Sequence, residues 1–126
     1  MEHRPDLNSR TEIVRLVDAF YERVRADDIL GPIFNDVADV DWAHHLPKMY
    51  DFWDSVLFGA PGFKGDPLDV HRKLAMRAPL GAREFARWLM LFDESVDALF
   101  SGPGADNVKL RAKRIASVMQ HHIHGD

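Results

Sequence analysis

The sequence predicts an all-α fold, and three observations lead to that class. Apolar residues recur at helical spacing in four long segments of the chain. No segment alternates apolar and polar residues as a half-buried strand does. Glycine and proline residues separate the helical segments from one another. The 126 residues suit a single domain over 1–126, because this length allows one hydrophobic core and is too short for two ordinary domains.

The first helix is predicted to begin at Ser9, after a loose leader over residues 1–8. Ser9 and Glu12 form a capping-box pattern, in which each side chain satisfies a free backbone N–H of the first turn. The apolar positions that follow are spaced as one helix face and are Ile13, Leu16, Val17, Phe20, Tyr21 and Val24. A Gly-Pro pair then interrupts the chain, and residues 29–34 are predicted to form an apolar turn or a short helix.

A second long helix is predicted from about residue 41 to residue 57. Its apolar face carries His45, Met49, Phe52, Trp53, Val56 and Leu57. Pro47 lies inside this helix, where a proline removes a hydrogen bond, so an irregular first turn or a bend is expected there. Residues 59–67 contain three glycines and two prolines and are predicted to form a loop.

Three further helical segments complete the chain. A short one covers about residues 68–76, and long ones cover about 82–100 and 105–123. A Gly-Pro-Gly sequence separates the last two. Their apolar faces carry Phe85, Trp88, Leu89, Phe92, Val96, Leu99 and Phe100 in one helix, and Val108, Ala112, Ile115, Ala116, Met119 and Ile123 in the other.

The composition argues against several classes of protein. The net charge is −4 and no basic stripe stands out, so a nucleic-acid partner is not expected. No apolar run reaches the roughly 18–20 residues of a membrane span, and no membrane association is expected. The chain has no cysteine, which excludes disulfides, thiol catalysis and zinc-thiolate sites. With no export signal visible either, a cytoplasmic location is expected.

The sequence has no phosphate-binding glycine loop, no nucleophile elbow and no His-Glu-x-x-His sequence. What remains is one polar or metal-capable side chain on the apolar face of each of four helical segments: Tyr21, His45, His71 and Trp88. Each has a simpler interpretation. His71 alone would be a partly buried histidine bonded to a backbone carbonyl, His45 a surface residue, and Tyr21 and Trp88 packing rings. Together the four fit a haem pocket, which needs one neutral imidazole, apolar walls and a few donors.

Five short stretches in a fixed order carry a resemblance to a known family. They occupy residues 20–25, 30–34, 52–53, 67–71 and 85–89. Their sequences are Phe-Tyr-Glu-Arg-Val-Arg, Leu-Gly-Pro-Ile-Phe, Phe-Trp, Pro-Leu-Asp-Val-His and Phe-Ala-Arg-Trp-Leu. This ordered set resembles the truncated haemoglobins, specifically their third group, from about residue 11 to residue 120. The resemblance implies a two-over-two helical sandwich around haem b.

The resemblance also implies roles for single residues. His71 is implied as the proximal iron ligand, and Tyr21 and Trp88 as donors over the distal face. His45 takes the position of the family's distal gate histidine, and Met49 lines the distal pocket. Whether the His45 ring points into the pocket or out of it stays open, because a proline follows two residues later.

Further residues are expected to contact the haem ring or its propionates. The apolar walls are expected to include Phe52, Trp53, Leu68 and Phe85. The cations Lys48, Arg72 and Arg77 flank the pocket-lining segments and are candidates to bind the haem propionates. Solvated surface charges are the alternative for these three, since exposed ion pairs contribute little.

The predicted function is binding of O₂ or another diatomic ligand on ferrous haem iron. Two distal donors favour slow release, which suits redox handling of O₂, nitric oxide or peroxide rather than bulk transport. Dioxygenase or peroxidase-like activity stays open, as does the unidentified reductase that such activity requires, and a monomer is expected. The alternatives are a cofactor-free helical interaction module and a non-haem metal enzyme.

Overall fold

The computed structural model describes residues 3–124, which form five α-helices and one short π-helical segment without any strand. The elements in chain order are α1 (Arg10–Ala26), η1 (Ile33–Val37), α2 (Trp42–Phe58), α3 (Pro67–Ala75), α4 (Ala82–Leu99) and α5 (Pro103–His124). The all-α prediction is confirmed, and the predicted α-helix boundaries lie within two residues of the observed ones. The short helical segment expected over residues 29–34 is found later, as η1. None of the helices in this range is long and apolar enough to cross a bilayer.

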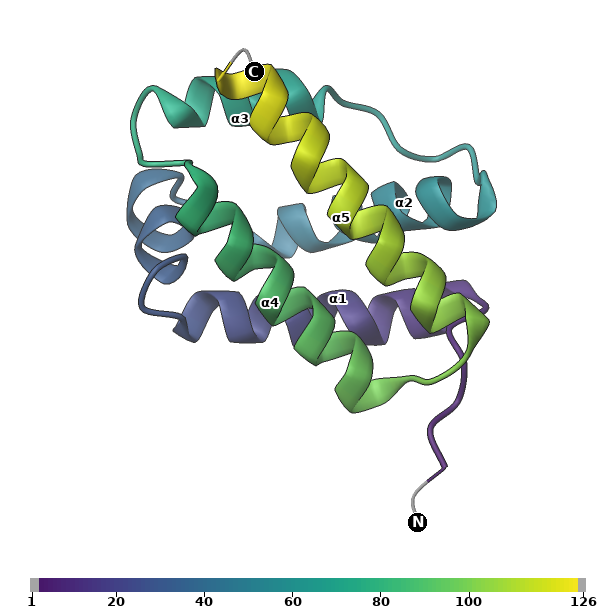
Figure 1. The fold of residues 1–126 in the computed structure, drawn as a ribbon. Coiled ribbons are helices and arrows are strands. Elements are labelled where there is room, and N and C mark those ends of the chain that lie inside the picture. The colour runs from purple at the N-terminus through teal and green to yellow at the C-terminus, as the bar shows by residue number, and fades with distance from the viewer. Residues whose placement is uncertain (1–2, 125–126) are drawn as a thin grey trace.

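The helices form two crossed pairs. α1 packs against α2 and against α4, while α5 packs against α4 and carries α3 at its far end. Figure 1 shows α1 and α2 running alongside each other, with α4 and α5 crossing in front of them. This is the predicted two-over-two arrangement. The short α3 has no fully buried residue of its own.

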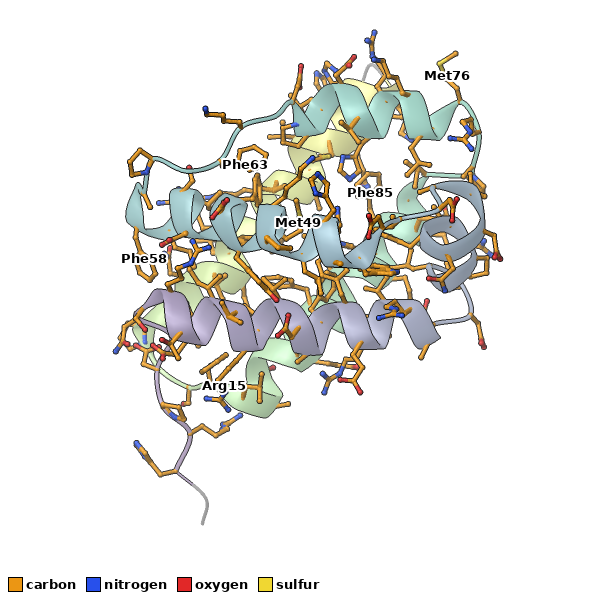
Figure 2. The ribbon with its side chains drawn as sticks, turned by 180° about the vertical axis from the view of Figure 1, so that it is seen from behind. Arg15, Met49, Phe58, Phe63, Met76 and Phe85 are labelled. Atoms are coloured by element: carbon orange, nitrogen blue, oxygen red, sulfur yellow. The ribbon has the colours of Figure 1, made fainter. Side chains whose placement is uncertain are left out.

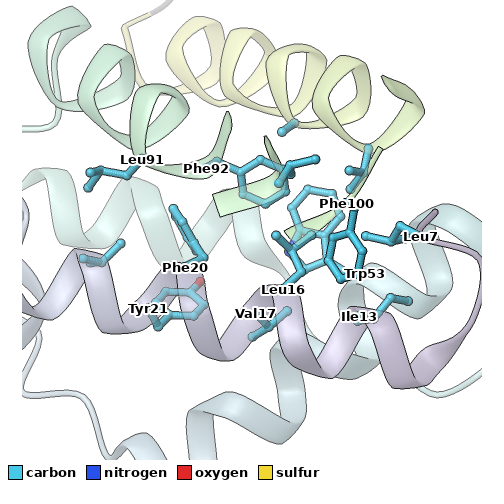
Figure 3. Packing of buried hydrophobic residues seen from close by; sticks show 14 of the residues in the cluster. Leu7, Ile13, Leu16, Val17, Phe20, Tyr21, Trp53, Leu91, Phe92 and Phe100 are labelled. Carbon is cyan, nitrogen blue, oxygen red and sulfur yellow. The ribbon is translucent and has the colours of Figure 1, made fainter. Parts of the chain in front are cut away.

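The centre of the core is a cluster of aromatic rings contributed by three helices. Phe20 of α1 and Trp53 of α2 both lie against Phe92 of α4, with ring centroids 5.3 and 5.0 Å apart (Figure 3). All three side chains are almost completely buried. Their positions follow from the apolar faces in the sequence, because each ring lies mid-helix on such a face. The cluster fixes α1, α2 and α4 relative to one another.

The segment before α1 is held against the domain, which corrects the expectation of a loose leader over residues 1–8. Leu7 is 2% exposed and belongs to the core. The Asp6 carboxylate accepts hydrogen bonds from the backbone N–H groups of Gly104 and Ala105, at 3.0 and 2.9 Å. These N–H groups lie in the first turn of α5, where no helical partner exists and a negative charge is favourable. Residues 1 and 2 lie outside the described range.

Two local predictions in the helices also need correction. Ser9 does precede α1, but its hydroxyl donates to the Glu12 carboxylate at 2.7 Å and caps no backbone N–H. The Ser9 hydroxyl therefore bonds to the charged Glu12 side chain instead of the backbone N–H that the predicted capping box requires. α2 begins at Trp42 and continues without interruption through Pro47, so the irregular first turn, one of the two alternatives expected there, is absent. Gly59, with φ at 69°, ends α2 in the left-handed conformation that glycine adopts most readily.

Candidate functional site

A pocket of about 270 Å³ lies among all five α-helices. Met49, Phe63 and Phe85 can be followed in Figure 2, on either side of the space between α2 and α3. The predicted site residues that line this pocket are Tyr21, His45, Lys48, Met49, Phe52, Trp53, His71, Phe85 and Trp88. The four segments that the sequence singled out therefore meet at one place.

Three predicted haem-binding residues lie outside the pocket lining. Leu68 borders a neighbouring groove between α3 and α5. Arg72 is paired with Asp69 on its own helix, at 2.5 Å. Arg77 donates to the backbone carbonyl of Val37, at 2.7 Å. Among the three propionate candidates, Lys48 alone is part of the pocket wall.

His71 is oriented by a hydrogen bond within α3. Its Nδ1 lies 2.6 Å from the backbone carbonyl oxygen of Pro67. A carbonyl only accepts, so the proton resides on Nδ1 and the lone pair on Nε2. Burial lowers the pKa of His71, and the bond to Pro67 offsets part of that effect. The residue is thus a neutral, oriented imidazole on the pocket wall, which is the state that a metal requires.

Tyr21 contributes a hydroxyl from α1. Its ring is 6% exposed and lies edge-on to Phe20, at 4.8 Å between centroids (Figure 3). Burial raises the pKa of Tyr21, so the hydroxyl keeps its proton and acts as a donor. The residue faces a pocket whose walls are mostly apolar and aromatic, where an acceptor atom of a ligand would be a favourable partner.

The His45 side chain points into the molecule, although Pro47 follows only two residues later. Its Nε2 is buried and has no hydrogen-bond partner among residues 3–124. The ring lies edge-on to Tyr21 and to Trp42, with centroids 5.4 and 5.6 Å apart. Burial, together with the positive charge of Lys48, lowers the pKa of His45 and favours the neutral ring. A buried nitrogen without a partner is an unused polar group that a ligand can satisfy.

Trp88, on α4, also lines the pocket. Its ring stacks on Phe92 at 5.5 Å and meets Phe20 edge-on, also at 5.5 Å. These contacts tie the indole to the aromatic core while the residue still borders the pocket. Trp88 therefore serves as packing ring and pocket residue together, so the simpler interpretation and the functional one are compatible.

Several lining residues were missed by sequence reasoning. Phe63 and Lys64 come from the Gly/Pro-rich loop, where no periodicity marks a residue as inward-facing. Glu84 is buried at the pocket wall, but its carboxylate is used to accept the Gly81 N–H at 2.9 Å. Ile115 and Met119 were identified as apolar positions of the last helix, and their spacing could have placed them here.

The residues present fit a haem. The pocket offers an oriented His71 imidazole with a free Nε2 lone pair, walls that are mostly apolar with several aromatic rings, and a buried His45 nitrogen without a hydrogen-bond partner among residues 3–124. This donor set is typical of a haem site, in which one axial ligand suffices and the surrounding polarity is low. Residues 3–124 contain no group of three or more His, Asp or Glu side chains able to hold a metal ion.

Comparisons with known proteins relate the chain to the globins. Residues 7–124 match the family described as bacterial-like globin. The chain is 34% identical to the group 3 truncated hemoglobin ctb of Campylobacter jejuni over 119 residues, which covers 92% of this chain and 91% of the relative. The crystal structure of the group III truncated hemoglobin from Campylobacter jejuni superposes with a TM-score of 0.85 and 32% identity, covering 97% of this chain and 96% of that one.

Proposed function

Because the chain belongs to the bacterial-like globin family, among relatives that are group III truncated haemoglobins, we propose that its pocket binds haem b through His71 and holds a diatomic gas. Haem-based ligand binding in general follows from the family. When bound, the haem supplies an iron that binds diatomic gases and exchanges electrons. The observation that carries the proposal is the His71 hydrogen bond to Pro67, which fixes the tautomer with Nε2 free.

His71 holds the axial position in this proposal. The Pro67 carbonyl keeps the Nδ1 proton in place, so the ring neither rotates nor changes tautomer when Nε2 is engaged. The ring is neutral at physiological pH because burial disfavours its charged form. His71→Ala should therefore lose the haem or bind it weakly. The absorption spectrum of the reduced protein with carbon monoxide, in buffer without imidazole, measures this.

A matched control is available on the surface of α2. His44 is exposed and does not line the pocket, so His44→Ala should keep a normal spectrum. A normal five-coordinate ferrous spectrum in His71→Ala would refute the assignment of the axial ligand. A purified protein without any haem absorption, after haem has been supplied, would refute the proposal as a whole.

Tyr21 and Trp88 are proposed to donate hydrogen bonds to the bound gas. Dioxygen in such a site carries partial negative charge, so an uncharged O–H or N–H donor stabilises it by about 1 kcal/mol. Removing one donor should raise the rate of O₂ release about five- to tenfold, at about 1.4 kcal/mol for each tenfold change. Two donors thus favour slow release, which supports redox handling of O₂, nitric oxide or peroxide over bulk transport.

Stopped-flow O₂ dissociation from the Tyr21→Phe protein tests this donor role. Tyr50→Phe is a matched control, because it removes the other tyrosine hydroxyl of the chain, which donates to Asp18 away from the pocket. Carbon monoxide has less charge on its outer atom and should respond less than O₂. Equal O₂ release from Tyr21→Phe and the unchanged protein would show that the hydroxyl does not reach the ligand.

The proposed setting is a cytoplasmic monomer served by a reductase. The sequence has no cysteine and therefore no disulfide, which is usual for proteins of a reducing compartment, and redox turnover of a gas requires an electron donor. Sedimentation of the haem-loaded protein measures the oligomeric state, and a dimer would refute the proposal of a monomer.

A further inference from the structure

Trp42 is the first residue of α2 and contacts the polar groups of the pocket from their outer side. Its ring centroid lies 5.6 Å from that of His45, edge-on, and 5.3 Å from that of Tyr21. It also stacks on Phe34 of η1, with 6.1 Å between centroids and 22° between planes. Trp42 therefore joins three elements, α1, η1 and α2, at the place where the His45 and Tyr21 side chains meet.

The same indole is held from the end of α1 by a cation. The guanidinium carbon of Arg25 lies 5.1 Å from the centre of the Trp42 ring. A cation over an indole face is attracted by the electrons of the ring. Arg25 is exposed, so this contact covers Trp42 from the solvent side while His45 and Tyr21 contact it from within.

The inward position of His45 requires such support. Its Nε2 is buried without a partner among the described residues, so rotation of the ring into water would gain a hydrogen bond. Contacts with Tyr21 and Trp42 oppose that rotation. Tyr21 is fixed in the core, whereas Trp42 is half-buried at the start of a helix, and its contribution can be changed without opening the core.

We propose that Trp42, held by Arg25, is a positioning residue that keeps the His45 ring inside the pocket and thereby sets how fast a diatomic ligand enters and leaves. The effect of Trp42 on ligand entry rests on the proposed function. Its effect on the orientation of His45 rests on packing alone. With Trp42 in place, the His45 ring lies beside Tyr21 and forms part of the pocket wall. Without Trp42, the ring turns toward solvent and leaves more room for an entering ligand.

Carbon monoxide association, measured by flash photolysis of the haem-loaded protein, tests the effect on ligand entry. Trp42→Ala should associate about five- to tenfold faster, which corresponds to about 1 to 1.4 kcal/mol. Trp42→Phe retains an edge-to-face partner and should restore most of the slow rate. Arg25→Gln should accelerate entry about twofold. The matched control is Arg23→Gln, since Arg23 donates to the Ala19 carbonyl of its own helix and should leave the rate unchanged.

A double variant separates positioning from a general loosening of the protein. If Trp42 acts through His45, then Trp42→Ala should have no further effect on association in a His45→Ala background. Nuclear Overhauser contacts between the His45 and Tyr21 rings provide a readout that needs no ligand. They should be present in the unchanged protein and in Trp42→Phe, and lost in Trp42→Ala.

The outcomes are distinguishable from those of the haem proposal. An unchanged protein that binds no haem refutes the proposed function, while the ring contacts in the haem-free form still test the role of Trp42. The role is refuted if Trp42→Ala keeps both the ring contacts and the slow association. It is equally refuted if the acceleration persists in full after His45 is removed. Should Trp42→Ala fail to fold, Trp42→Leu retains more volume and is judged by the same results.

Discussion

Replacing Asp27 tests the ion pair that ties the end of α1 to α4. Its carboxylate accepts hydrogen bonds from Arg87 Nε at 2.7 Å and from the backbone N–H groups of Ile29 and Leu30 at 3.0 and 2.9 Å. The Asp27 side chain is only 3% exposed. Burial alone would raise the pKa of Asp27, but the bonds from Arg87 and the two N–H groups outweigh it and lower that pKa below 3.8.

The loss of stability expected for Asp27→Ala follows from the hydrogen-bonding groups that lose their partner. Two N–H groups lose their acceptor, and Arg87 loses its partner. Removing one member of a buried pair costs about 3–5 kcal/mol. The Arg87 side chain is 34% exposed, so water can solvate its charge after Asp27 is removed, which reduces the cost. We therefore expect the free energy of unfolding to fall by about 2–4 kcal/mol. For a chain of this length that is about 8–16 °C in Tm, at about 4 °C per kcal/mol. Asp27→Asn keeps an acceptor oxygen and should lose about 1–2 kcal/mol.

Urea unfolding and thermal melts at equal haem content measure these losses. Asp97→Asn is the control, because Asp97 is 58% exposed in its pair with Lys109 and should contribute below about 0.5 kcal/mol. The folded pKa of Asp27 lies below its unfolded value, so its stabilisation is present above about pH 4 and is lost as the pH falls further. The difference between Asp27→Asn and the unchanged protein should shrink over that range. A constant difference from pH 7 to pH 3, or a negligible loss in Asp27→Ala, would refute the reasoning.

Three further outcomes are expected. Lys48→Gln should speed haem transfer to an acceptor globin about threefold, while Arg72→Gln should not, because Lys48 lines the pocket and Arg72 does not; equal rates would contradict this. Asp6→Ala removes the cap of α5 and should cost about 1 kcal/mol in urea unfolding. Gly104→Ala should cost about 2 kcal/mol or more in the same assay, because an added Cβ would lie 2.1 Å from the Leu7 carbonyl oxygen. A stable Gly104→Ala would show that the Leu7 segment detaches easily.

The fold could be predicted because the apolar residues of each long helix recur at the helical period. Phe20, Phe92 and Trp53 lie on apolar faces that repeat at the helical period, and all three prove to be core residues. The segment before α1 could not be predicted in the same way. Its attachment depends on Asp6 meeting N–H groups 98 and 99 residues away, and no local pattern reports a contact of that range.

The candidate site was predicted in part, for a related reason. Tyr21, His45, His71 and Trp88 stand out because a polar group on an apolar face is unusual, and all four line the pocket. The specific role of His71 came from the family resemblance, since a histidine bonded to a carbonyl is compatible with either reading. Trp42 was not singled out, because its importance lies in contacts between elements rather than in a repeat along one helix.

The attachment of Asp6 to the start of α5 has a consequence for synthesis of the chain on the ribosome. Asp6 and Leu7 emerge about a hundred residues before the N–H groups that they will meet. Until residue 105 has left the exit tunnel, Leu7 lacks part of its burial site and the carboxylate has no partner. The nascent chain can pair α1 with α2 early, but the contact between Asp6 and α5 must form late. Pulse proteolysis of stalled chains should find the N-terminal segment susceptible to cleavage until the first turn of α5 has left the exit tunnel.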